Sequence, residues 1–299
     1  MKKVLILGNR GYVGSKLTDY LTSHDVSGID IGWFTPGESR DYNSLTEQEL
    51  TSYDVIILVA GNSSVATCQG NINSPWANNV TNFVNLINKV TKDQLVIYAS
   101  SASVYGNSKP GEYHRETDGQ FVPVNNYDVT KYTLDLHAKI FLEQGYNIVG
   151  LRFGTVNGWA PYIRTDVMIN AMYQSYLKKD RVEITNRYIG RAILGTNDLA
   201  RAVETIIEDP IPGIYNLASF NSTVGAIGQA VSDRCITPMI DKGNTANAYD
   251  FGIDTGSFEQ LYDFEFKETA ISIIDGLLEK RPNSQGRRDN YMEYNYGTL

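Results

Sequence analysis

The chain has 299 residues, of which 42% are hydrophobic, so it can bury a sizeable core and is not a disordered chain. Lys and Arg number 26 against 34 Asp and Glu, and this net charge of −8, without a long basic run, argues against a nucleic-acid partner. The mean hydropathy of −0.28 argues against a membrane protein, and two isolated cysteines argue against a metal site and fit the cytoplasm.

The first half of the chain alternates short apolar runs with amphipathic helical patterns. Strands are predicted at residues 4–7, 26–31, 55–60, 95–99 and 148–153. Helices are predicted after the glycines that follow residue 7, at the capping box of residues 46–49, and over 77–90 and 127–143. In the last of these, Val129, Tyr132, Leu136 and Ile140 are expected to face the core. This alternation predicts an α/β fold, a doubly wound parallel sheet of Rossmann type.

The regular alternation of strand and helix patterns ends after residue 158. Helical patterns at 166–179, 199–208 and 268–278 are separated by longer loops, which indicates a smaller lobe over the carboxyl edge of the sheet. We therefore expect a sheet domain at 1–158, a lobe mainly at 159–280 and a polar tail at 281–299. The core of the first domain is also expected to take in segments near 190–218.

A glycine-rich loop lies between the first strand and the first helix. Gly8, Gly11 and Gly14 have GxxGxxG spacing, which lets the backbone turn sharply and approach a pyrophosphate at the helix N-terminus. Asp30 lies at the end of the second strand, where a carboxylate can bind an adenosine ribose and repel a 2′-phosphate. This favours NAD, whereas Arg10 in the same loop would suit the 2′-phosphate of NADP.

Two further motifs supply hydroxyl groups and a cation. Tyr127 and Lys131 are four residues apart, so the phenol and the ammonium share one helix face. Because a nearby cation favours the phenolate, Lys131 is expected to lower the pKa of Tyr127 and make the phenol a usable acid/base. Ser101 follows the strand at 95–99, and ligands of open α/β sheets bind outside that edge.

Together and in this order, these motifs resemble the extended short-chain dehydrogenase/reductase family, in its NAD-dependent nucleotide-sugar epimerase and dehydratase branch. The resemblance runs from residue 4 to about residue 218. It implies Ser101, Tyr127 and Lys131 as the catalytic set, and Ser101, Thr155 and Arg191 as substrate contacts. It assigns cofactor binding to the first domain and substrate binding mainly to the lobe. The implied cofactor contacts are Gly8, Arg10, Gly11, Tyr12, Val13, Gly14, Asp30, Asp41, Ala60, Gly61, Asn79, Tyr127 and Lys131.

Departures from the family pattern bear on the substrate. Thr155 stands where many sugar epimerases of this family have asparagine, and Gly195 stands where they have histidine. Dehydratases of the family place Asp-Glu directly after the hydroxyl residue, where this chain has Ala102 and Ser103. Neither of these side chains can act as that acid, so dehydration is disfavoured.

The resemblance therefore implies an NAD-dependent epimerase of a nucleotide sugar that works through a transient 4-keto intermediate. One alternative is an NAD(P)H-dependent reductase of a keto-sugar or similar carbonyl, and another is a non-catalytic dinucleotide-binding module. The resemblance also implies a homodimer, paired through the helices at 77–90 and 127–143. The expectation of a cytoplasmic protein without a metal rests instead on the two isolated cysteines and on the lack of a membrane-spanning stretch.

Overall fold

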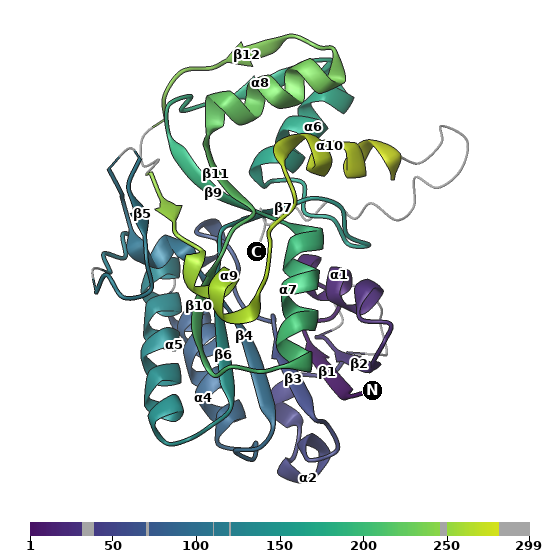
Figure 1. The fold of residues 1–299 in the computed structure, drawn as a ribbon, viewed down its shortest axis with the longest axis vertical. Coiled ribbons are helices and arrows are strands. Elements are labelled where there is room, and N and C mark those ends of the chain that lie inside the picture. The colour runs from purple at the N-terminus through teal and green to yellow at the C-terminus, as the bar shows by residue number, and fades with distance from the viewer. Residues whose placement is uncertain (32–38, 70–71, 110, 120, 246–249, 281–299) are drawn as a thin grey trace.

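Six parallel strands form the central sheet of the computed structural model, in the order β10-β6-β4-β3-β1-β2 (Figure 1). The structure describes residues 1–31, 39–69, 72–109, 111–119, 121–245 and 250–280, so the predicted tail at 281–299 lies outside the described residues. The strands of the sheet are β1 (Lys3–Leu7), β2 (Asp25–Ile29), β3 (Val55–Leu58), β4 (Leu95–Ser101), β6 (Ile148–Phe153) and β10 (Gly213–Leu217). The predicted fold, a doubly wound parallel sheet of Rossmann type, is confirmed.

Helices cover both faces of this sheet, and the inner strands β1, β3 and β4 are accordingly apolar on both sides. One face packs against α1 (Tyr12–Tyr20) and α7 (Thr196–Glu208), through side chains such as Leu17 and Ile206. The other face packs against α4 (Asn82–Ile87) and α5 (Asn126–Glu143) (Figure 1). This second layer also contains α2 (Glu47–Leu50), α3 (Asn73–Trp76) and the π-helical turn Ala77–Thr81.

The helix α5 buries a different stripe from the predicted one. Leu134, Ala138 and Phe141 are buried against the sheet, whereas Leu136 is 41% exposed and Ile140 is 51% exposed. The prediction that these last two residues face the core was wrong. The helix carries two apolar stripes, and only the stripe that contains Leu134 meets the sheet.

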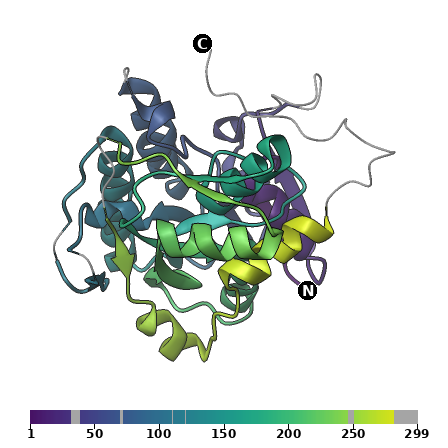
Figure 2. The same ribbon diagram turned by 90° about the horizontal axis from the view of Figure 1, so that it is seen from above.

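The lobe stands over the carboxyl edge of the sheet (Figure 1). Its helices are α6 (Met168–Lys179), α8 (Val224–Cys235) and α10 (Ala270–Glu279), and Figure 2 shows α8 and α10 side by side. They share one apolar core. Short strands complete the lobe and the loops beside it: β5 (Tyr113–His114), β7 (Thr155–Asn157), β8 (Val182–Ile184), β9 (Gly190–Gly195), β11 (Phe220–Thr223), β12 (Met239–Asp241) and β13 (Gly252–Ile253).

The segment near 190–218 contributes to both parts. β10 pairs with β6 in the central sheet, while β9 pairs with β7 and β11 in a three-stranded sheet. The division of the chain into domains stays a prediction. No helix within the described ranges is long and apolar enough to cross a membrane.

Two buried carboxylates join the start of α7 to the segment before α10. Glu268 Oε2 accepts hydrogen bonds from the backbone N–H of Asn197 (2.8 Å) and of Asp198 (2.9 Å), so Glu268 caps α7. In return, the Asp198 carboxylate accepts hydrogen bonds from the N–H groups of Lys267 and Glu268. Gly195 makes room for this exchange, because a Cβ atom there would lie 2.0 Å from Glu268 Oε2.

Candidate active site

The predicted site residues gather where the parallel strands end. Leu7 pairs with Ile29, and Ser101 pairs with Phe153, so the carboxyl ends of these strands lie along one edge. The glycine loop follows β1, Asp30 follows β2, and Ser101 is the last residue of β4. The topology therefore brings the predicted cofactor and catalytic residues to the same edge.

The glycine loop has the shape that a dinucleotide phosphate requires. Gly8 has φ +94°, and a Cβ atom there would lie 2.6 Å from the backbone nitrogen of Ala60. At Gly14 a Cβ atom would lie 2.0 Å from the Gly8 carbonyl oxygen, so α1 can approach the loop only with glycine there. The N-cap residue, Gly11, has no side chain to satisfy the first N–H groups of α1, and the first turn carries no acid. This end of the helix therefore suits an anion, and the residues fit NAD.

Asp30 shapes this loop as well as presenting a carboxylate. Its Oδ2 atom accepts a hydrogen bond from the backbone N–H of Arg10 at 2.9 Å, and Oδ1 accepts one from Ile31. Asp41, the second predicted acid, is exposed and caps a short turn by accepting a hydrogen bond from the N–H of Asn43. Ribose binding by Asp30 and adenine-side binding by Asp41 stay predictions.

Asn79 lies behind the loop that follows β3. It is 2% exposed, and its Oδ1 atom accepts a hydrogen bond from the N–H of Asn62 at 2.8 Å. Its Nδ2 group donates to the carbonyl of Asn62 and to Thr130 Oγ1 on α5. Gly61 has φ +144°, and a Cβ atom there would lie 2.6 Å from Asn79 Oδ1. Asn79 thus anchors the loop to α5, and its contact with a cofactor stays a prediction.

Ser101, Tyr127 and Lys131 converge at the end of β4. The Ser101 hydroxyl makes a hydrogen bond with Tyr127 and lies 2.8 Å from the hydroxyl of Ser103. The Lys131 Nζ atom lies 6.0 Å from the centre of the Tyr127 ring and donates a hydrogen bond to the carbonyl of Ala99 at 2.8 Å. The predicted catalytic residues are therefore together, with Lys131 held by the strand β4.

Burial dominates the protonation of this group. It raises the pKa of Tyr127 to about 12, although the hydrogen bond to Ser101 and the positive charge of Arg164 oppose that shift. Burial also lowers the pKa of Lys131 to about 8, against the opposing charge of Asp135. The expected lowering of the Tyr127 pKa by Lys131 was wrong for the chain alone, because desolvation of the phenol outweighs the attraction of a cation directed at Ala99.

Arg164 is a residue of this site that the sequence reasoning missed. Its guanidinium lowers the pKa of Tyr127 and donates hydrogen bonds to Asp166 at 2.6 Å and to the carbonyl of Ser63 at 3.2 Å. Arg164 lies in the loop after Gly158. The available signal was a cation in a loop that follows strands ending at this edge, but Arg164 belongs to none of the motifs on which the sequence analysis relied.

The buried ammonium of Lys131 gives a pH-dependent stability. Because its pKa is about 8 in the folded chain and 10.5 ordinarily, the unfolded chain binds more protons between these values. The free energy of unfolding of the wild type, measured against Lys131→Met, is therefore expected to rise by about 2 kcal/mol from pH 8 to pH 10. Urea unfolding across this range measures it, with Lys139→Met at an exposed position of α5 as the control. A difference that does not change with pH contradicts the expectation.

A cavity of about 590 Å³ lies in the lobe and is lined by two of the three predicted substrate residues. Thr155 and Arg191 both line it, although Ser101, Tyr127 and Lys131 are not among its described lining residues. The guanidinium of Arg191 lies 4.9 Å from the centre of the Phe251 ring, and its Nη1 group donates to the carbonyl of Gly190. Along α6, one face is turned to the cavity: Met168, Ala171, Ser175 and Lys178.

The Arg164–Asp166 ion pair connects this cavity with the sheet edge. Asp166 lines the cavity, while the charge of Arg164 acts on Tyr127. The cavity has the size of a small-molecule site. Among the described residues, no group of three or more His, Cys, Asp or Glu side chains is placed to hold a metal ion.

Curated relatives and solved structures are similar to this chain. Protein CapI of Staphylococcus aureus is 26% identical over 246 residues, which cover 70% of each chain. UDP-glucuronate 4-epimerase 4 of Arabidopsis thaliana is 26% identical over 210 residues, which cover 60% of this chain and 47% of that relative. The structure of UDP-glucuronic acid 4-epimerase from Bacillus cereus, with UDP-glucuronic acid and NAD, has a TM-score of 0.78 at 18% identity, covering 92% of this chain and 97% of that one.

A second solved structure with a similar fold is that of an enzyme with a different activity. The NAD-dependent NDP-hexosamine 5,6-dehydratase TunA has a TM-score of 0.81 at 17% identity, covering 93% of this chain and 97% of that one. At these identities the likeness shows the fold alone. The family is shown separately, because the model of the "NAD dependent epimerase/dehydratase family" matches residues 4–218. The chain therefore belongs to the NAD-dependent epimerase/dehydratase family, as its sequence motifs predicted.

Proposed function

We propose that this protein is an NAD-dependent epimerase that inverts a carbon of a nucleotide sugar through a transient 4-keto intermediate. The observation that carries the proposal is the convergence of Ser101, Tyr127 and Lys131 at the end of β4, on the same sheet edge as the glycine loop. The Tyr127 phenol is the acid/base in this proposal. Both relatives named above as 4-epimerases act on a UDP-linked uronic acid, which supports a nucleotide sugar as the substrate class.

The chain's own residues would move the proton. Tyr127 takes it from the sugar hydroxyl, and Ser101 holds the same oxygen by a hydrogen bond. Lys131, with a pKa of about 8, is mostly charged at pH 7. The charge of Arg164 and the hydrogen bond with Ser101 favour the phenolate, against the desolvation that disfavours it. When bound, NAD supplies the acceptor and then the donor of the hydride at the same carbon. Tyr127 returns the proton to the inverted alcohol, so the proton balance closes.

The cavity supports the part of the proposal that concerns the nucleotide. Arg191 is the cation expected to bind a phosphate through a charge-assisted hydrogen bond. Thr155 lines the same cavity, immediately beyond the end of β6, and so lies toward the sheet edge. We propose that the sugar is held near Thr155 and the phosphates near Arg191, along the face that α6 turns to the cavity.

Stoichiometry tests the reaction type. An epimerase turns over a nucleotide sugar with sub-stoichiometric NAD, because the cofactor is regenerated. A reductase consumes one NADH for each product formed, and a binding module gives no turnover. A panel of nucleotide sugars, followed by chromatography and by the absorbance of NADH, separates these outcomes. Either of the last two results overturns the epimerase proposal.

The cofactor preference rests on the charge of Asp30. Asp30→Asn keeps an oxygen that can accept from the N–H of Arg10, but it removes the charge. We expect about tenfold weaker NAD binding, since hydrogen bonds to charged groups are worth about 1.5–3 kcal/mol. The preference of NAD over NADP should shrink as well. Fluorescence titration of both cofactors measures this, and a wild type that binds NADP at least as tightly as NAD contradicts the assignment.

We also propose that the protein is a homodimer. Leu136 and Ile140 leave an apolar stripe of α5 exposed, and Trp76, just before the π-helical turn, is 40% exposed. This stripe supports pairing through the helices at 77–90 and 127–143, which light scattering at micromolar protein would test.

Cys68 and Cys235 both carry free thiols, which supports the cytoplasm as the compartment.

A further inference from the structure

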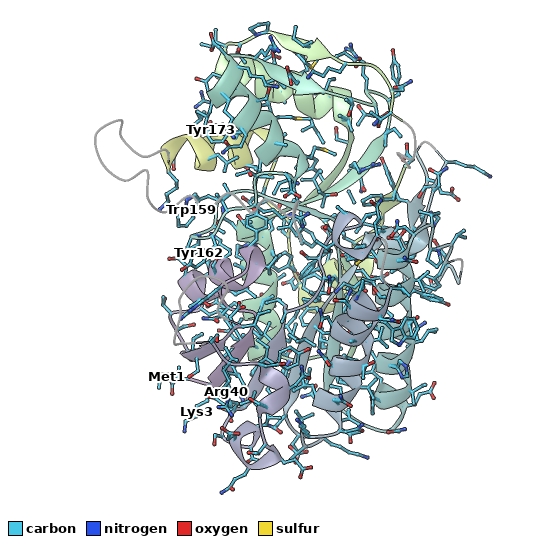
Figure 3. All side chains as sticks on the ribbon, turned by 180° about the vertical axis from the view of Figure 1, so that it is seen from behind. Met1, Lys3, Arg40, Trp159, Tyr162 and Tyr173 are labelled. Carbon is cyan, nitrogen blue, oxygen red and sulfur yellow. The ribbon has the colours of Figure 1, made fainter. Side chains whose placement is uncertain are left out.

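Side chains of α1 reach from the cofactor edge to the lobe. Tyr12, the first residue of the helix, donates a hydrogen bond from its hydroxyl to the carbonyl of Gly158 at 2.7 Å. One turn later, Ser15 Oγ accepts a hydrogen bond from the N–H of Tyr162 at 3.2 Å. Figure 3 shows Tyr162 and Trp159 at this junction, between α1 and the lobe. The helix that begins at the glycine loop is therefore tied to the loop that leads into the lobe.

Asn170 is the centre of this junction. It lies in the first turn of α6 and is 1% exposed. Its Oδ1 atom accepts a hydrogen bond from the N–H of Gly158 at 2.9 Å. Its Nδ2 group lies within hydrogen-bond distance of the Tyr12 hydroxyl (3.0 Å), the Gly158 carbonyl (3.2 Å) and the Arg164 carbonyl (2.8 Å). Because every polar atom of this buried amide is engaged, it cannot shift without its partners.

Each partner of Asn170 leads to a different part of the site. Tyr12 belongs to the glycine loop and the first turn of α1. Arg164 pairs with Asp166 at the cavity. Asn170 itself precedes Ala171, from which the cavity-lining face of α6 continues. Gly158 has φ +124°, and a Cβ atom there would lie 2.6 Å from Thr196 Oγ1, so the clamped backbone has little freedom to relax.

We propose that Tyr12 and Asn170 couple the two ligand sites, so that a dinucleotide at the glycine loop strengthens the binding of a nucleoside diphosphate in the cavity. Because this network is fully bonded, a displacement of α1 on dinucleotide binding moves Gly158 and α6 with it, and the nucleoside diphosphate then meets a cavity face that is already in place. By linkage, the nucleoside diphosphate strengthens dinucleotide binding by the same factor. Asn170 acts here as a positioning residue. The inference rests on the proposed function for the identity of the two ligands.

The test measures a ratio of affinities. UDP is titrated calorimetrically into the full chain, without and with saturating NAD, for the wild type and for Tyr12→Phe. We expect NAD to tighten UDP binding about tenfold in the wild type, within the usual range of such couplings. Tyr12→Phe removes only the bridging hydroxyl. In this variant the ratio of the UDP affinity with NAD to the UDP affinity without NAD should fall to within about twofold of one. Tyr176→Phe, on α6 in the lobe core, is the matched control and should keep the wild-type ratio.

A second variant checks the same link from its other end. Asn170→Ser should also bring the ratio close to one, and Tyr12→Phe should then add no further loss. If this ratio is equal in the wild type and in Tyr12→Phe, the proposed coupling is overturned, even if the variant changes the two UDP affinities themselves. A wild-type ratio of one overturns it as well. If the wild type binds no UDP with or without NAD, the proposed function fails instead.

Discussion

Tyr127→Phe is expected to lower turnover by about 10²–10⁴-fold, because it removes the phenolic proton that the proposed reaction transfers and returns. The ring remains to fill its half-buried position. NAD affinity should change little, since the other cofactor contacts are retained. Initial rates with a nucleotide sugar, together with a fluorescence titration of NAD, measure both effects.

The matched control for this variant is Tyr132→Phe, on the same helix. The ring of Tyr132 stacks on Phe121 at 4.9 Å and packs beside a separate apolar cluster. Its loss of a hydroxyl should leave turnover within about twofold of the wild type. If Tyr127→Phe keeps near-full activity, then both the epimerase and the reductase mechanisms are excluded.

Asp135→Asn is expected to lower the free energy of unfolding by about 3–5 kcal/mol, because it leaves Arg152 buried without its partner charge. Arg152 is 1% exposed, and its Nε group donates to Asp135 Oδ2 at 2.8 Å. The remaining Asp135 oxygen accepts a hydrogen bond from the Tyr98 hydroxyl at 2.9 Å. Urea unfolding at pH 7 measures the loss.

A double variant separates the cost of an unpaired charge from the cost of lost packing. Replacing both members, as Asp135→Leu with Arg152→Met, should destabilise the fold less than Asp135→Asn alone. A loss below about 1 kcal/mol in Asp135→Asn would contradict the expectation for a buried pair. Because Asp135 raises the pKa of Lys131, the charge-removing variant should also lower the pKa of that ammonium.

Five of the six strands of the sheet could be predicted from the sequence, because they are short and bounded by turn residues. The strand β10 was covered only by the expectation that segments near 190–218 join the core. Helix boundaries and faces were harder, as α5 shows: Leu136 and Ile140 have the helical spacing of a buried stripe, yet Leu134 and Phe141 fill the core. The helix α8 was not predicted, since Gly225 and Gly228 lower its helix propensity. A Cβ atom at Gly228 would lie 2.7 Å from Ile184 Cγ2, so close packing against β8 explains the glycine.

The candidate site could be predicted where a motif lies within one strand-loop-helix unit, as at Gly8 and in the pair Tyr127 and Lys131. The electrostatics could not, because the desolvation that raises the Tyr127 pKa depends on segments distant in the sequence. Arg164 was missed for the same reason, since only the folded chain brings its loop to the phenol.

The reciprocal hydrogen bonds of Asp198 and Glu268 have a consequence for the order in which this chain folds during its synthesis on the ribosome. The acceptor that satisfies the first N–H groups of α7 comes from a residue that follows Asn197 by 71 positions. At about 5–20 residues per second, roughly 4–14 s of synthesis separate the helix from its cap. During that interval the exposed end of α7 has only water as an acceptor. The cap of α7 is therefore formed only after the segment that precedes α10 has emerged.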